Sequence, residues 1–102
     1  MKTIWKYELK IIDFQAIENM PEGAKILHVD VQTINRNTGD DFIIKWDKLM
    51  LWALVNPDNQ LCTRRFAVVG TGNPFPTEET QYIGTVQMLG MVRHVFELIG
   101  EE

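Results

Sequence analysis

Apolar and polar side chains alternate along most of this chain, and that pattern predicts β-strands. In the segment TIWKYEL, Trp5, Tyr7 and Leu9 face one side, and charged side chains face the other. The same alternation runs through KILHVDVQ, where the apolar positions are Leu27, Val29 and Val31. The run LMLWALV, residues 49–55, is apolar throughout, which predicts a central strand covered on both faces.

Further strands are predicted for RFAVV, YIGTVQM and MVRHVFEL. The last two flank Leu89-Gly90, which predicts a tight hairpin in which Gly90 supplies the positive φ. The segment DFQAIENM is compatible with a strand or with a helical turn opened by Asp13, and we favour the strand. The C-terminal RHVFELIGEE has some helical spacing, but its Val, His and Phe residues favour a strand to about Leu98.

The connections between these segments are rich in Gly, Pro, Asn and Asp, as turns are. We therefore predict a single domain over residues 1–102 with an all-β, mainly antiparallel fold. The expected form is a small rolled sheet or sandwich of six to eight strands with little or no helix. A chain this short hides its sheet edges only by closing up or by pairing with another copy, so a homo-oligomer is an expectation too.

Charge and cysteine content narrow the function classes. The formal net charge is −4, and Lys and Arg are scattered rather than gathered in a basic stripe, which disfavours nucleic acid and anionic membranes as ligands. Cys62 is the only cysteine, so an intrachain disulfide is excluded and a reducing compartment is favoured. The longest apolar run is far shorter than the roughly 20 residues of a spanning helix. We expect a soluble protein of the cytoplasm.

The stretch RRFAVVGTGNPFP places two arginines close to a glycine-rich loop. It lacks the Lys of a phosphate-binding P-loop and the third glycine of a dinucleotide fingerprint. A backbone nest for an anion remains, with the candidate residues Arg64, Arg65, Gly70, Thr71, Gly72 and Asn73. We favour the simpler interpretation, in which residues 70–73 only turn the chain and the arginines are solvated charges of an edge strand.

Catalytic chemistry finds little support in this sequence. The chain has no serine, and Cys62 lacks a defined partner. His28, Asp30 and His94 could share a metal only if their strands were adjacent, and we expect both histidines to be structural, with His94 hydrogen-bonded to backbone. We predict no enzyme activity, no metal and no cofactor.

The segment DDFIIKWDK lies between two turns and carries Phe42, Ile44 and Trp46 in alternation. If residues 33–48 form a protruding hairpin, this apolar face covers little of the main core. Exposed aromatic side chains of that kind are typical partner anchors. The alternative is an ordinary additional strand packed on the sheet.

The blocks TIWKYEL, MPEGAKIL, LWALVNP, RRFAVVGTGNP, YIGTVQM and HVFEL together resemble a family of small phage-encoded proteins of unknown function. The resemblance departs at residues 33–48, which look like an inserted hairpin. It implies an accessory protein made in the cytoplasm of an infected bacterium.

Three functional hypotheses follow. The leading one is a non-catalytic binding protein that acts by occupancy on a host factor, such as a defence system. The alternative is an oligomeric sponge for an anionic nucleotide signal, held by residues 70–73 with Arg64 or Arg65. An enzyme that uses Cys62 or a His–Asp metal site is a distant third.

Overall fold

The computed structural model describes residues 1–37, 39 and 43–100, and these residues form seven strands and no helix. The strands are β1 (Thr3–Leu9), β2 (Phe14–Pro21), β3 (Lys25–Asn37), β4 (Ile43–Val55), β5 (Leu61–Gly70), β6 (Thr80–Met88) and β7 (Met91–Leu98). The predicted all-β fold is confirmed. The two ambiguous segments, β2 and β7, are both strands, and β7 ends at Leu98 as expected.

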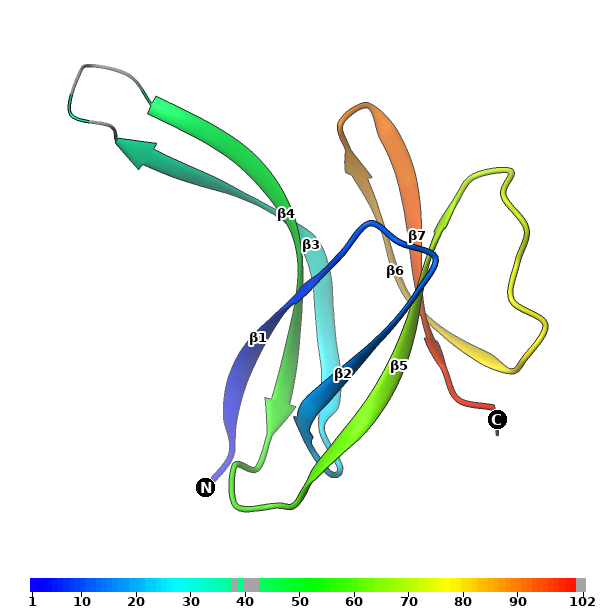
Figure 1. Cartoon of the computed structure of the whole chain (residues 1–102). Helices are drawn as coiled ribbons and strands as arrows, with labels where there is room; N and C mark the ends of the chain where they lie inside the picture. The colour runs from blue at the N-terminus through cyan, green and yellow to red at the C-terminus, as the bar shows by residue number, and fades with distance from the viewer. Residues whose placement is uncertain (38, 40–42, 101–102) are drawn as a thin grey trace.

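The strands form two antiparallel sheets, which Figure 1 shows as two layers. The first sheet has the order β1-β4-β3, and the second has the order β2-β5-β7-β6. Buried side chains from both sheets belong to one apolar cluster, so the sheets pack face to face as a sandwich. Each of the strands β1, β2, β3 and β6 is the edge of its sheet.

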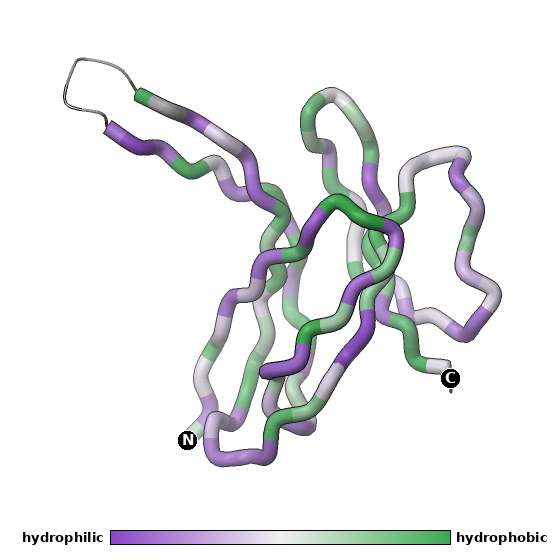
Figure 2. The backbone as a smooth tube through the Cα atoms, viewed as in Figure 1, coloured by the Kyte–Doolittle hydropathy of each residue, from purple (hydrophilic) through white to green (hydrophobic). Residues whose placement is uncertain are grey.

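The core between the sheets follows the alternation predicted for β1. Tyr7 and Leu9 are buried and Trp5 packs against the same core cluster, while Lys6 and Glu8 are exposed. Leu51 of β4, Phe66 of β5 and Val95 of β7 have no exposed surface. Full burial of an aliphatic or aromatic side chain of this kind stabilises the fold by about 1.5–3 kcal/mol. Figure 2 shows apolar and polar positions alternating along these strands.

Two details of the predicted burial are wrong. A β-bulge between Ile26 and His28 gives Leu27 no partner in β4, so Ile26 packs on the core and Leu27 is 45% exposed. β4 is central in its sheet, but it is not covered on both faces. Trp52 and Leu54 on its outer face are only half-buried, because the described residues supply no second layer there.

A second apolar cluster lies on the outer face of the β2-β5-β7-β6 sheet. It contains the buried Ala67, Val69 and Leu98, with Phe96 packed against them. Phe75, from the loop after β5, meets the Phe96 ring edge-on at a centroid distance of 4.9 Å. The loop between β5 and β6 is therefore held against the sheet by aromatic packing.

The β6–β7 hairpin turns at Leu89-Gly90, as predicted. Gly90 has φ 75°, but Leu89 also has a positive φ of 54°. Two consecutive positive φ angles match the type I′ turn, whose twist suits a two-residue hairpin. A leucine rarely adopts this conformation, and the sequence pattern did not predict it.

Gly84 allows the edge strands of the two sheets to approach each other. A Cβ atom at this position would lie 2.7 Å from Cγ1 of Val29, a buried residue of β3. A bulge between Tyr82 and Gly84 in β6 lies at the same contact. The absence of a side chain at residue 84 thus sets how closely β6 packs on β3.

We predict that Gly84→Ala lowers the free energy of unfolding by about 1–3 kcal/mol, because the added methyl group overpacks the contact with Val29. Urea denaturation monitored by circular dichroism measures this change. Val29→Ala removes the clashing methyl groups, so the double variant should lose less stability than the sum of the two single variants. Additive losses would contradict the proposed contact.

Candidate functional site

The outer halves of β3 and β4 form a two-stranded hairpin that extends beyond the sandwich (Figure 1). We call residues 33–37 and 43–48 the projecting hairpin. Apart from Lys48, which pairs with Gln32, they pair only with each other in the described chain, because β1 pairs with β4 only from Leu49 onward. Ile34 pairs with Trp46, and Thr33 Oγ1 donates a hydrogen bond to Asp47 Oδ1 at 2.8 Å.

The projecting hairpin exposes apolar side chains. Trp46 is 37% exposed, and Ile43, on the opposite face of the hairpin, is 60% exposed. Of the three predicted anchors, Phe42 and the side chain of Ile44 lie outside the described residues. Trp46 is therefore the predicted anchor that the structure locates, and Ile43 is an exposed apolar residue outside the predicted set.

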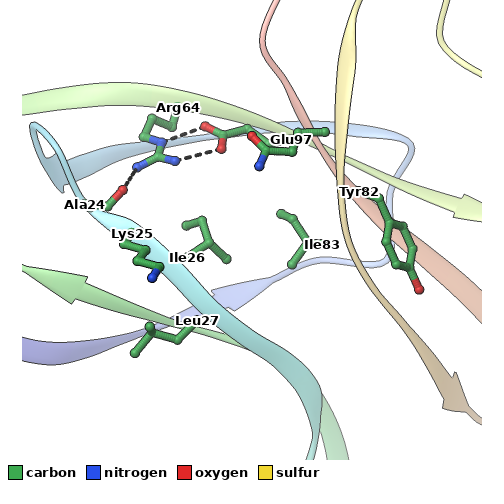
Figure 3. A pocket seen from close by; sticks show the side chains of 9 residues that line it. Ala24, Lys25, Ile26, Leu27, Arg64, Tyr82, Ile83 and Glu97 are labelled. Atoms are coloured by element: carbon green, nitrogen blue, oxygen red, sulfur yellow. Dashed lines mark hydrogen bonds and ion pairs between the residues drawn. The ribbon is translucent and has the colours of Figure 1, made fainter.

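Arg64 points into the sandwich and is paired within the chain. Its Nε and Nη2 atoms donate to the two carboxylate oxygens of Glu97 at 2.6 and 2.7 Å, and Nη1 donates to the Ala24 carbonyl (Figure 3). Glu97 is only 8% exposed. The hydrogen bonds that Arg64 donates to Glu97 raise the pKa of Arg64 above its usual value, although burial acts in the opposite direction.

Arg65 points to the opposite face of β5, as neighbouring residues in a strand do. Its guanidinium group donates to both carboxylate oxygens of Glu78 at 2.9 and 3.0 Å and to the Gly100 carbonyl at 2.9 Å. This hydrogen bonding lowers the pKa of Glu78 below its usual value. Arg65 thereby ties the end of the β5–β6 loop to the C-terminal segment.

The interpretation of both arginines as solvated edge charges is wrong. β5 lies between β2 and β7 rather than at an edge, and each guanidinium group makes a bidentate ion pair. The carboxylate partners are 33 and 13 residues away in sequence, so no local pattern pointed to them.

Residues 70–73 form a β-turn. The Asn73 N–H donates to the Gly70 carbonyl at 3.1 Å, and Gly72 has φ 87°, which fits the third position of a type II turn. The Thr71 hydroxyl lies 2.9 Å from His94 Nε2. This geometry is that of residues that turn the chain, which is the interpretation that we favoured. Arg64 lies apart from the turn, because its side chain points between the sheets.

The histidines lie in different parts of the sandwich. His28 is on the outer face of the first sheet, with Nε2 3.5 Å from Asp30 Oδ2. His94 is on the outer face of the second sheet, between the hydroxyls of Thr71 and Thr85. The expected backbone hydrogen bond of His94 is thus replaced by side-chain partners.

Among the described residues, no three His, Cys, Asp or Glu side chains gather closely enough to hold a metal ion. The same residues contain no helix long and apolar enough to cross a membrane.

A pocket of about 370 Å³ opens beside the Arg64–Glu97 pair, between the edge strands β3 and β6 (Figure 3). Ile26, Leu27 and Ile83 supply apolar walls. The remaining lining residues are Ala24, Lys25, Arg64, Gln81, Tyr82 and Glu97. Sequence reasoning missed this pocket, because its shape depends on the bulges of two strands that are far apart in sequence.

The comparison with family models covers the entire chain. A model described as a domain of unknown function, DUF7352, matches residues 1–102. The chain belongs to this family. No curated protein and no solved structure matches the DUF7352 chain. Membership of a family of unknown function agrees with the resemblance in the sequence, while the phage origin stays a prediction.

We predict that Glu97→Ala in this DUF7352 protein lowers the free energy of unfolding by about 1–3 kcal/mol, because it leaves the partly buried Arg64 guanidinium group without its carboxylate partner. Thermal and urea denaturation measure the loss.

The matched comparison is the double variant Arg64→Met with Glu97→Leu, which removes both charges and keeps apolar volume. It should recover most of the stability. A double variant as unstable as Glu97→Ala would contradict an ion-pair origin of the effect.

Proposed function

We propose that this protein is a non-catalytic binding protein that acts by occupancy and engages a protein partner through the projecting hairpin. The observation that carries the proposal is a two-stranded hairpin that leaves the sandwich and exposes Ile43 and Trp46. A lone two-stranded hairpin is marginally stable in water, and exposed apolar groups add no core to it. Burial against a partner would supply the apolar contacts that the hairpin lacks.

The chemistry of the hairpin suits a protein surface. Tryptophan is among the residues that most often dominate binding energy at protein interfaces. Both edges of the hairpin also present unpaired backbone groups among the described residues, so an extended segment of a partner could add as a further strand. The formal net charge of −4 disfavours a nucleic acid in the same place.

The resemblance to phage-encoded proteins implies the source of the partner. We extend the proposal to a bacterial host factor, such as a component of a defence system, which the protein would block by covering its surface. Arg64, Arg65 and residues 70–73 have no part in this function.

The test is capture of a partner from host lysate by the tagged protein, followed by a binding measurement with the purified partner. Trp46→Ala should weaken binding at least about thirtyfold, since truncating an interface anchor costs about 2 kcal/mol or more. Ile43 lies on the opposite face of the hairpin, so Ile43→Ala should weaken binding less than Trp46→Ala does.

Leu61→Ala is the matched control, because Leu61 is a half-exposed apolar residue at the start of β5, away from the hairpin. It should bind like the wild type. Equal binding by the Trp46→Ala, Ile43→Ala and Leu61→Ala variants would overturn the proposed surface.

The pocket beside Arg64 supports the second candidate function, capture of a small anionic ligand such as a nucleotide signal. Its volume of about 370 Å³ falls within the range of small-molecule sites. Lys25 and Arg64 bring positive charge to it, although Glu97 neutralises Arg64. The site for this alternative is thus the pocket rather than the turn at residues 70–73.

Mass spectrometry of the supernatant after denaturing the purified protein tests this alternative. A retained nucleotide, lost in Lys25→Ala, is the expected result if the pocket binds an anion. A supernatant without nucleotide, together with no binding of added nucleotides in calorimetry, would exclude the small-ligand function.

A further inference from the structure

The four edge strands of the sandwich differ in how their edges are protected. β2, β3 and β6 each contain a register shift, between Ile17 and Met20, Ile26 and His28, and Tyr82 and Gly84 respectively. Bulges of this kind disrupt an edge and discourage pairing with another chain. β1 pairs with β4 in unbroken register from Thr3 to Leu9, and its other edge has no strand partner among the described residues.

The charges on β1 select one way of pairing with a second copy. In an antiparallel pair, residues directly opposite each other point to the same face of the sheet. When the two strands are identical and related by a two-fold axis, one residue must therefore lie opposite its own copy, and the axis passes at that residue. An axis at Lys6 or at Glu8 would oppose like charges, and an axis at Trp5 would leave Lys6 opposite the partner's Ile4. An axis at Tyr7 places Lys6 opposite the partner's Glu8, and Glu8 opposite the partner's Lys6.

Both faces of the strand fit this register. On the solvent face, the Glu8 side chain is 48% exposed even though Lys48 contacts it at 3.1 Å, so it is accessible to a second lysine. On the core face, the half-buried Trp5 would lie opposite the partner's Leu9. Charged pairs and apolar pairs across neighbouring strands both stabilise a sheet.

We propose that the protein forms a homodimer by antiparallel pairing of β1 with β1 of a second copy, with the two-fold axis at Tyr7. The two copies then share one continuous sheet, to which each contributes three strands. This interface goes beyond the proposed function, since β1 ends at Leu9, opposite Leu49, before the projecting hairpin begins.

Two charge reversals test the interface in the full chain by sedimentation equilibrium. In K6E, positions 6 and 8 are both negative, and in E8K both are positive, so each variant opposes like charges across the axis. The dimer dissociation constant of each variant should be about tenfold or more above that of the wild type. An equimolar mixture of K6E and E8K should form a heterodimer, because every opposed pair is then of opposite sign.

The mixture keeps the test decisive, because variants that had merely unfolded would not recover by mixing. K45E makes the same lysine-to-glutamate change as K6E, but on the projecting hairpin, and this variant should dimerise like the wild type. A monomeric wild type, or single reversals that dimerise normally, would overturn the proposal. Dimerisation lost in K45E would also overturn it by placing the interface on the hairpin.

Disulfide cross-linking checks the register in a Cys62→Ala background. Directly opposed residues in an antiparallel pair have Cα atoms about 4.5–5.5 Å apart, which a disulfide spans. A mixture of K6C and E8C should therefore cross-link on oxidation, whereas K6C alone should not. Cross-linking of K6C with itself would place the axis at Lys6 and contradict the register.

Discussion

The ion pair between Arg64 and Glu97 connects the parts of this fold that have to stay in register. Arg64 belongs to β5 and Glu97 to the neighbouring β7, while the Ala24 carbonyl that accepts the third hydrogen bond precedes β3 in the other sheet. A buried charge is tolerated only when paired and hydrogen-bonded, so the sheets must keep the spacing that satisfies this guanidinium group. The pocket between β3 and β6 lies beside this ion pair.

Much of the fold could be predicted from the sequence, because strand formation depends on alternation between neighbours. Tyr7 and Leu9 are buried where the pattern placed them, and Gly90 has the positive φ that the hairpin needs. Leu27 was misplaced because a bulge shifts the alternation by one residue. Pairing across sheets, such as the contact that Gly84 makes with Val29, depends on residues far apart in sequence and leaves no local pattern.

The candidate site was less predictable for the same reason. Arg64 and Arg65 beside Gly70 suggested an anion site, but their charges are used by Glu97 and Glu78 from distant segments. The projecting hairpin was visible in the sequence because apolar residues between two turns have no nearby core to cover. Trp46 is exposed on that hairpin, whereas Phe42 and the Ile44 side chain lie outside the described residues.

The two proposed surfaces together constrain how the protein would hold a partner. The projecting hairpin leaves the sandwich beyond the Leu9 end of β1, where Leu9 pairs with Leu49. Because the two copies of β1 run in opposite directions about the axis at Tyr7, the two hairpins would leave the shared sheet at opposite ends. Hairpins arranged in this way cannot clamp one compact target between them. The dimer would instead bind two partner molecules, or two distant sites of one assembly, and gain avidity only in the second case.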